Sequence, residues 1–412
     1  MKKKPVNGMK DILPDEMAVR DYVISLIKST YASFGFSGME TPAMESIENL
    51  QSKQGGENEK LIFKIMKRGE KLRIDEAQTE NDLADAGLRY DLTVPLSRYY
   101  ANHMAELPSP FKALQIGSVW RADRPQRGRY RQFTQCDIDI LGEDTYLAEI
   151  ELILATTTVI SRLGFRGFTI RINDRRILKA MAASCGFPEE DYDRIFIILD
   201  KMDKIGQDGV RGELLENGYA PEQVEKYLSM FNGDPADSAR LLVLKEQLGD
   251  ALADNSAEEL KKIIDTVDAV KEGNFQIRFD PTLVRGMSYY TGPIFEISMD
   301  ELGSSVGGGG RYDRMVERFA GTPVSACGFS IGFERIILLL MERGFTVPDA
   351  AEKTAVLVDK KADTDKLVEI FKSAAEARRE GRAVTVSSMK KNRRFQKEQL
   401  AAQGFDKIED VY

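Results

Sequence analysis

Arginine is concentrated between positions 121 and 131 of a chain whose formal net charge is −8. Five of these eleven residues are arginine, and Phe133 follows shortly after them. Guanidinium groups donate planar, bidentate hydrogen bonds that suit phosphate, and an aromatic face suits an adenine ring. The stretch therefore predicts a site for an anionic ligand. The alternative is a solvated basic loop that pairs with nearby carboxylates.

Two carboxylates follow the arginine-rich stretch. Asp137 and Asp139 alternate with Ile138 and Ile140, so a β-strand here would place both aspartates on one face. Beside so many arginines, this face predicts a pocket for a substrate amine or imidazole. The alternative is a half-exposed strand whose polar face lies in water.

Residues 283–296 offer a second group of reactive side chains. Arg285, Tyr289 and Tyr290 stand close to two glycines, which would place a fixed cation and two hydroxyl groups near a tight turn. The alternative is a hairpin whose tyrosines belong to the core.

Two glycine-containing segments follow. Residues 307–310 are four consecutive glycines, which would let the backbone approach a ligand closely, although they lack the spacing of a phosphate-binding P-loop. Residues 328–336 lead into an apolar helix that carries Glu334 and Arg335, and the arginine would reach a phosphate from the first turn. The alternatives are a flexible linker and an ordinary surface ion pair.

Several other chemistries are excluded by composition. His103 is the only histidine, so a Ser-His-Asp triad or a site with several histidines would depend on that one residue, which we interpret as structural. Cys136, Cys185 and Cys327 are far apart, which argues against a disulfide framework or a zinc site. We expect three reduced, mostly buried thiols in a cytoplasmic protein.

The chain has 412 residues, of which 42% are hydrophobic and 30% charged, as in ordinary globular proteins of two or three domains. No apolar run approaches the roughly 18 residues that cross a membrane. The N-terminus is basic but leads into no hydrophobic segment, so we expect no signal peptide.

Hydrophobic periodicity predicts the elements that would position these residues. It indicates helices over residues 15–34 and 145–163, an antiparallel strand pair within 111–142, and strands at 168–172 and 275–279.

The periodicity changes twice further along the chain. Residues 174–270 read as helical throughout. Strands at 354–358 and 383–386, each followed by a helix (365–379 and 390–403), predict a small α/β domain with a parallel sheet.

Taken in order, these segments resemble the signature motifs of the histidyl-tRNA synthetases. The resemblance extends over roughly residues 5–340, with the helical stretch matching in position more than in sequence. The matching segments are the family's opening (8–14), the class II dimer motif around Pro42, the amino-acid binding strand (89–95), the ATP loop (120–135), two histidine motifs (284–296 and 308–313) and the third class motif (328–335).

The resemblance implies an α+β fold, in which the antiparallel sheet of class II synthetases is flanked by helices. It implies a catalytic domain in two parts, residues 1–173 and 273–345, interrupted by a helical insertion at 174–272. A shortened α/β domain resembling the family's anticodon-binding domain would follow at 350–412.

The resemblance also implies a reaction and its partners. The histidine carboxylate would attack the α-phosphorus of ATP to give histidyl-adenylate and pyrophosphate, and the terminal adenosine of histidine tRNA would then take the acyl group. Mg²⁺ would bridge the ATP phosphates, and no metal site made by the protein alone is expected. A cytoplasmic homodimer without membrane contact is expected.

The resemblance assigns five residues to ATP. Arg121 would hold the α-phosphate and the amino-acid carboxylate. Phe133 would stack on adenine, with Arg335 on its other side binding the tail phosphates. Asp123 and Arg131 would also bind ATP.

The resemblance assigns a second set to histidine. Arg121 and Arg285 would be the catalytic cations, both near the α-phosphate. Asp91, Thr93 and Gln135 would bind the α-amino group. The residues expected near the imidazole are Asp139, Tyr289 and Tyr290.

The sequence departs from the family pattern at two places. Ser288 stands where the family usually has an acidic residue, which puts the shape of the histidine pocket in doubt. The C-terminal region ends before the family's expected last strand and helix. Its five basic residues between positions 390 and 397 would meet tRNA backbone or form a solvated basic helix.

The main alternative is the regulatory subunit of ATP phosphoribosyltransferase, a non-catalytic relative that senses histidine. Such relatives tend to lose the arginine of the first histidine motif and parts of the ATP loop. Arg121, Arg285 and Arg335 are all present, which favours the ligase. A histidine-binding domain of a larger kinase is disfavoured because no kinase sequence accompanies it.

Overall fold

The computed structural model describes residues 2–51, 60–232, 238–285, 289–301, 303–348 and 351–412. Internal contacts divide the chain into two compact units. The first comprises Met1–Asp11 and Val23–Arg343, and the second comprises Ile12–Tyr22 and Gly344–Tyr412. The departure at Ser288 lies outside the described residues.

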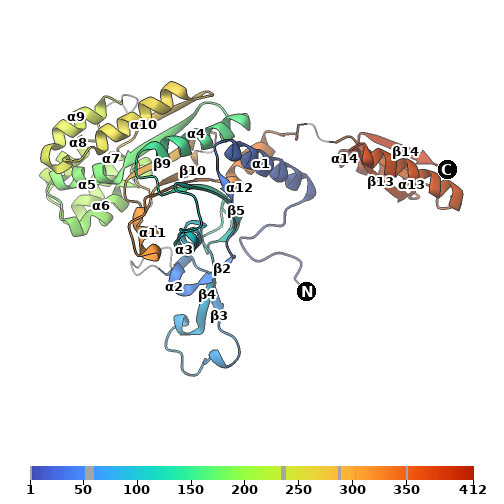
Figure 1. Cartoon of the computed structure of the whole chain (residues 1–412), viewed down its shortest axis with the longest axis horizontal. Helices are drawn as coiled ribbons and strands as arrows, with labels where there is room; N and C mark the ends of the chain where they lie inside the picture. The colour runs from blue at the N-terminus through green and yellow to red at the C-terminus, as the bar shows by residue number, and fades with distance from the viewer. Residues whose placement is uncertain (1, 52–59, 233–237, 286–288, 302, 349–350) are drawn as a thin grey trace. The chain divides into compact units, whose positions relative to one another are not determined.

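The first unit is built on an eight-stranded sheet in the order β1-β5-β6-β11-β10-β9-β7-β8 (Figure 1). Its strands are antiparallel except at the two edges, where β1 pairs with β5 and β7 pairs with β8 in parallel. The strands are β1 (Ser37–Gly38), β5 (Phe111–Trp120), β6 (Gln132–Leu141), β7 (Phe168–Asp174), β8 (Phe275–Phe279), β9 (Pro293–Met299), β10 (Ser304–Arg311) and β11 (Ala326–Ile331). The predicted antiparallel sheet flanked by helices is confirmed.

Helices lie on both sides of this sheet, with α4 and α10 on one side and α3 and α11 on the other in Figure 1. Cross-strand register aligns Arg311, Cys327 and Ile140 on one face, and Arg311 pairs with Glu149 of α4, so this is the face that α4 covers. The opposite face carries the aspartates of β6. The helices that flank the sheet are α3 (Thr93–His103), α4 (Leu147–Arg162), α11 (Asp313–Ala320), α12 (Phe333–Glu342) and, from Val23 on, α1 (Pro14–Ser33).

A smaller antiparallel sheet, in the order β2-β4-β3, precedes the long strands. Its elements are β2 (Met44–Ser46), β3 (Lys64–Met66) and β4 (Ala84–Leu88), with the short helices α2 (Ile47–Leu50), η2 (Gly69–Lys71) and η3 (Glu80–Leu83).

The chain between β7 and β8 is helical, as the sequence predicts. Apolar side chains pack inside it, including the fully buried side chains of Phe196, Leu214, Tyr227 and Leu260. The division into two units does not separate this stretch from the sheet. Its elements are α5 (Arg175–Ser184), η4 (Glu189–Asp191), α6 (Tyr192–Leu199), α7 (Met202–Glu216), α8 (Pro221–Ser229), α9 (Arg240–Leu248), η5 (Gly249–Leu252) and α10 (Ser256–Val270).

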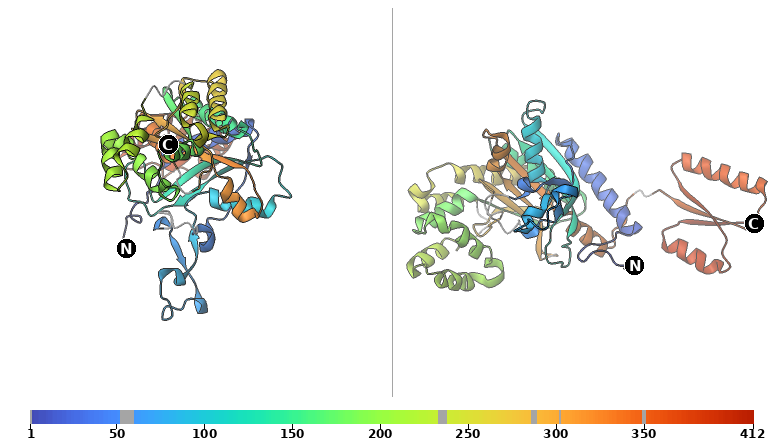
Figure 2. Two further views of the ribbon diagram at one scale, coloured as in Figure 1. Left: turned by 90° about the vertical axis from the view of Figure 1, so that its left-hand side faces the viewer. Right: turned by 90° about the horizontal axis from the view of Figure 1, so that it is seen from below.

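The second unit contains a parallel three-stranded sheet in the order β13-β12-β14, which confirms the predicted small α/β domain. Figure 2 shows one helix on each side of this sheet. The predicted strand-helix-strand-helix series was incomplete, because a third strand follows the basic helix and pairs with β12. The elements are β12 (Lys353–Val358), α13 (Thr364–Arg379), β13 (Ala383–Ser388), α14 (Arg393–Ala402) and β14 (Lys407–Val411).

None of the helices in the described part of the chain combines the length and the apolarity that crossing a bilayer demands.

Candidate active site

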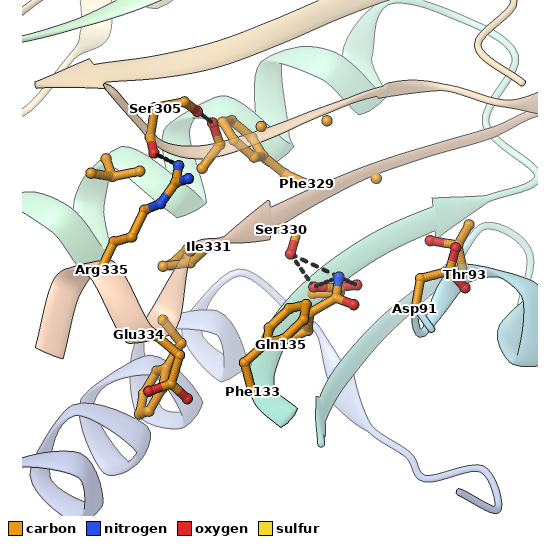
Figure 3. Close-up of a pocket in the computed structure, with 18 of the residues that line it drawn as sticks. Asp91, Thr93, Phe133, Gln135, Ser305, Phe329, Ser330, Ile331, Glu334 and Arg335 are labelled. Atoms are coloured by element: carbon orange, nitrogen blue, oxygen red, sulfur yellow. Dashed lines mark hydrogen bonds between the residues drawn. The ribbon is translucent and has the colours of Figure 1, made fainter. Parts of the chain in front are cut away.

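A cavity of about 400 Å³ opens on the face of the sheet that carries the β6 aspartates. Figure 3 shows that its lining comes from several elements, among them Asp91 and Thr93 at the start of α3, Gln135 on β6 and Arg335 on α12. Every predicted site residue lines this cavity except Arg131. Residues spread over some 245 positions of the sequence therefore meet in one place.

Glycines on β10 and β11 form the floor of the cavity beside β6. Gly328 lies opposite Asp139 in the sheet, and a Cβ there would stand 2.0 Å from the Asp139 carboxylate oxygen Oδ1. A Cβ on Gly309 would stand 1.9 Å from the Gly328 carbonyl oxygen. Only glycine fits at both positions, so the glycine run is a regular strand packed against its neighbours, and the flexible-linker alternative is wrong.

The aspartates of β6 are buried at one end of the cavity, which overturns the alternative of a solvated strand face. Asp137 accepts hydrogen bonds from the Ser330 hydroxyl and from the Gln135 amide, the latter at 3.1 Å. Asp139 accepts a hydrogen bond of 2.6 Å from the Tyr312 hydroxyl, and its second oxygen is buried without a partner among the described residues. That oxygen is an acceptor which a ligand can satisfy.

Burial makes this end of the cavity a poor place for negative charge. Desolvation raises the pKa of Asp137 to about 7, and it raises the pKa of Asp139 well above its usual range, with a further increase from Asp137. Desolvation also raises the pKa of Asp91. Carboxylates in this condition gain most from a ligand that brings a positive charge or hydrogen-bond donors.

Arginines line the remainder of the cavity. The Arg121 side chain donates a hydrogen bond of 2.8 Å to the Tyr90 carbonyl, and its guanidinium carbon lies 5.2 Å from the centre of the Phe133 ring. Arg335 donates to the Ser305 carbonyl. Desolvation lowers the pKa of Arg335, and the nearby positive charges of Arg129 and Arg285 lower it further. Cations that repel one another in this way are stabilised by an anion bound between them.

Arg131 is held elsewhere. Its Nε donates a hydrogen bond of 3.2 Å to the Asp123 carbonyl, and a Cβ on Gly8 would stand 2.8 Å from its side-chain carbons. Arg131 therefore fastens the N-terminal segment to the arginine loop. Arg129, two residues earlier, does line the cavity and approaches the Asp123 carboxylate at 3.8 Å.

The cavity thus joins buried carboxylates at one end to a cationic end that contains Arg335, Arg285 and Arg129. Arg121 lies close to the Phe133 ring and to the carboxylates of Asp91 and Asp137. The family model for histidyl-tRNA synthetase matches residues 8–336. The chain belongs to the histidyl-tRNA synthetase family.

Curated relatives agree with this family. The chain is 45% identical to the histidine–tRNA ligase of Leifsonia xyli subsp. xyli over 97% of its own length and 93% of that protein. It is 43% identical to a probable histidine–tRNA ligase of Tropheryma whipplei over 90% of its length and 87% of that protein.

Solved structures agree as well. The histidyl-tRNA synthetase of a Nostoc species superimposes with a TM-score of 0.81 at 28% identity, covering 98% of this chain and 90% of that one. A Bacillus halodurans protein described as an ATP phosphoribosyltransferase regulatory subunit/histidyl-tRNA synthetase gives a TM-score of 0.78 at 20% identity, covering 100% of this chain and 98% of that one. At that identity the likeness concerns the fold alone.

The structure adds cavity residues to which sequence reasoning gave no role. Tyr312 and Ser330 hold the two β6 aspartates, and Arg129 joins the cationic end. Tyr312 lies within the predicted histidine motif 308–313, but the resemblance assigned it no role. Ser330 lies within the predicted third class motif, but no local pattern predicts its contact with Asp137, which is almost 200 residues away.

Proposed function

We propose that the chain is a histidine–tRNA ligase that activates histidine with ATP and transfers it to the terminal adenosine of histidine tRNA. The observation that carries the proposal is the polarity of the cavity, in which the Asp139 oxygen without a described partner and the guanidinium groups of Arg121, Arg285 and Arg335 share one space. A zwitterionic amino acid with a polar ring suits the acidic end, and a polyphosphate suits the cationic end.

In this proposal the acidic end selects histidine. Asp139 and Tyr290 meet the imidazole, with Tyr289 beside them. Asp91, Thr93 and Gln135 take the α-ammonium group. A buried acceptor left unmet by a ligand without a ring donor carries a desolvation cost, which discriminates against apolar amino acids of similar size.

The cationic end carries out the phosphoryl chemistry. The histidine carboxylate attacks the α-phosphorus, and pyrophosphate leaves on the opposite side. Arg121 and Arg285 stabilise the charge that develops on the α-phosphate oxygens, and Arg335 holds the leaving phosphates while Phe133 stacks on adenine. Fixed cations are sufficient because this chemistry depends on positioning and on charge stabilisation. Arg131 supports this end indirectly, by holding the backbone at Asp123.

Mg²⁺ belongs to the nucleotide in this proposal. The described residues contain no group of three or more His, Cys, Asp or Glu side chains that would hold a metal ion by itself. Mg²⁺ commonly takes one or two carboxylates together with substrate phosphates. Asp123 and Glu334, which line the cationic end, fit that pattern. The ion would supply further neutralisation of the phosphate charge.

The remaining partners and boundaries are part of the same proposal. The enzyme acts as a cytoplasmic homodimer. Residues 1–173 and 273–345 form the catalytic domain, 174–272 form an insertion, and 350–412 form a reduced anticodon-binding-like domain.

The test is ATP–pyrophosphate exchange by the purified protein with and without histidine. We expect exchange that requires histidine and falls by about 10²–10³-fold in Arg285→Ala, as for loss of one charge-stabilising donor. Charging of histidine tRNA then tests the second step. Histidine binding in calorimetry without any exchange would favour the regulatory-subunit alternative.

A further inference from the structure

Arg285 borders two cavities. Besides the active-site cavity, it lines a second one of about 310 Å³, together with Arg171, Glu296, Asp200 and Asp203. The two aspartates lie at the junction of α6 and α7, in the helical stretch between β7 and β8. The insertion thus supplies part of the lining of the second cavity, which Arg285 also borders.

Cross-strand register places a polar row beside Arg285. Gly308 on β10 lies opposite Glu296 on β9, and Glu296 lies opposite Arg171 on β7, so the three positions share one face of the sheet. A Cβ on Gly308 would stand 2.7 Å from the Arg285 guanidinium carbon. The glycine therefore leaves the space through which the Arg285 side chain reaches Glu296.

Glu296 lies between two arginines. One of its carboxylate oxygens accepts a hydrogen bond from Nη1 of Arg285, which also donates to the Ser305 hydroxyl at 3.2 Å. Its other oxygen lies 3.7 Å from Nη1 of Arg171. The Glu296 side chain is only 17% exposed, so solvent screens these contacts weakly.

Arg171 extends the contacts to the insertion. Its Nε lies 2.6 Å from Asp280, and its Nη1 lies 2.9 Å from Asp203 on α7. The ion pairs therefore run without a break from the insertion to Arg285, through Arg171 and Glu296. The Arg285 groups Nε and Nη2 have no acceptor among the described residues, which leaves them available to an anion in the active-site cavity.

We propose that Glu296 and Arg171 are positioning residues that set the orientation of Arg285, and that Asp203 makes this orientation depend on the placement of helix α7. The inference rests on the proposed role of Arg285 at the α-phosphate. A guanidinium held on one side by a carboxylate presents its other donors in a fixed direction, and misplacing such a group by about 1 Å costs on the order of a hundredfold in rate.

Glu296→Gln tests the first step of the chain of ion pairs. The amide keeps the shape of the side chain but removes its charge. We expect kcat for histidine-dependent exchange to fall by about ten- to a hundredfold, while the KM values for histidine and ATP stay within about twofold. A residue with only a structural role would lower the melting temperature instead and leave kcat per folded molecule unchanged.

Arg171 provides an independent test if the Glu296 variant folds poorly. Arg171→Met should lower kcat in the same way, and Arg171→Lys should recover part of the loss because it restores the positive charge beside Glu296. Equal kcat values for the two Arg171 variants would contradict the charge-based link.

Asp203→Asn tests the link to the insertion, with Asp193→Asn as its matched control. Both aspartates are exposed residues of insertion helices that pair with an arginine, Asp203 with Arg171 at 2.9 Å and Asp193 with Arg175 at 3.5 Å. Since exposed ion pairs contribute up to roughly 1 kcal/mol, we expect kcat to fall about two- to fivefold in Asp203→Asn and to stay unchanged in the control.

The outcomes separate the two proposals. Wild-type protein without histidine-dependent exchange would overturn the ligase and, with it, the role assumed for Arg285. Normal wild-type exchange together with an unchanged kcat in Glu296→Gln and Arg171→Met would overturn the positioning role alone.

Discussion

Two central strands, β6 in the eight-stranded sheet and β12 in the C-terminal sheet, differ in what they bury. The β12 residues from Thr354 to Val358 are buried, and all but the threonine are apolar. In β6, Asp137 and Asp139 are buried as deeply, only 4% and 3% exposed. Burying a carboxylate opposes folding, whereas burying valine favours it. Strand β12 is therefore built for packing, whereas β6 gives up stability to bury polar groups in the cavity.

The largest expected effect is on the pH dependence of stability. Burial raises the pKa of Asp137 to about 7, so the folded protein binds a proton at this group that the unfolded chain releases near its ordinary pKa of about 4. The contribution of Asp137 to the free energy of unfolding therefore falls as pH rises from about 4 to about 7, by a total on the order of 4 kcal/mol. Asp137→Asn should remove this decline, so the variant gains stability over the wild type across that window in denaturant titrations.

Asp280→Asn is the control for this measurement. The Asp280 carboxyl is desolvated too, but Arg171 and Thr282 lower its pKa overall. The Asp280 carboxylate therefore stabilises the folded protein above about pH 4, and this stabilisation is lost as pH falls. A stability difference with the same slope for both variants would contradict the distinction between the two carboxylates.

The next effect concerns the oxygen of Asp139 that has no described partner. Asp139→Asn should lower kcat/KM for histidine in the exchange reaction by about ten- to a hundredfold, because a buried polar group left without its match costs about 1–3 kcal/mol. The KM for ATP should stay within about twofold, because the proposed ATP site lies at the cationic end. A parallel increase in both KM values would indicate a collapsed cavity.

A smaller change in stability is expected for a core substitution in the C-terminal sheet. Val356 is 8% exposed and packs with Val358 and Ile370. Val356→Ala should destabilise this unit by about 2 kcal/mol through lost burial and a small cavity, which hydrogen exchange over residues 351–412 would detect. Histidine-dependent exchange should be unchanged. Val386→Ala, in the partly buried edge strand β13, should cost less.

The smallest expected changes in stability are of opposite sign and concern two glycines of the insertion. Gly212 lies within α7 with open space around it, so Gly212→Ala should stabilise the fold by about 0.5–1 kcal/mol through helix propensity. Gly218 also has open space but a φ of +89°, so Gly218→Ala should destabilise the fold by roughly 1 kcal/mol. Thermal unfolding with shifts of the same sign would contradict this contrast.

The sequence predicted most of the fold because its local signals are strong. The apolar periodicity of α1 and α4 and the alternation in β5 and β6 depend on neighbouring residues alone. The sequence did not predict strand β14, because three of its five residues (Lys407–Val411) are charged and only two are β-branched and apolar. Pairing with β12 makes this segment a strand.

The amino-acid sequence specifies which chemical groups the protein possesses: an arginine-rich loop, alternating aspartates and a glycine run, in the order of a known family. The neighbours of these groups depend on the tertiary structure. It buried Asp139 beside Gly328, directed Arg131 away from the cavity and joined Arg285 to Glu296. The physical reason is that burial and ion pairing depend on groups brought together across the sheet, from positions that local patterns do not connect.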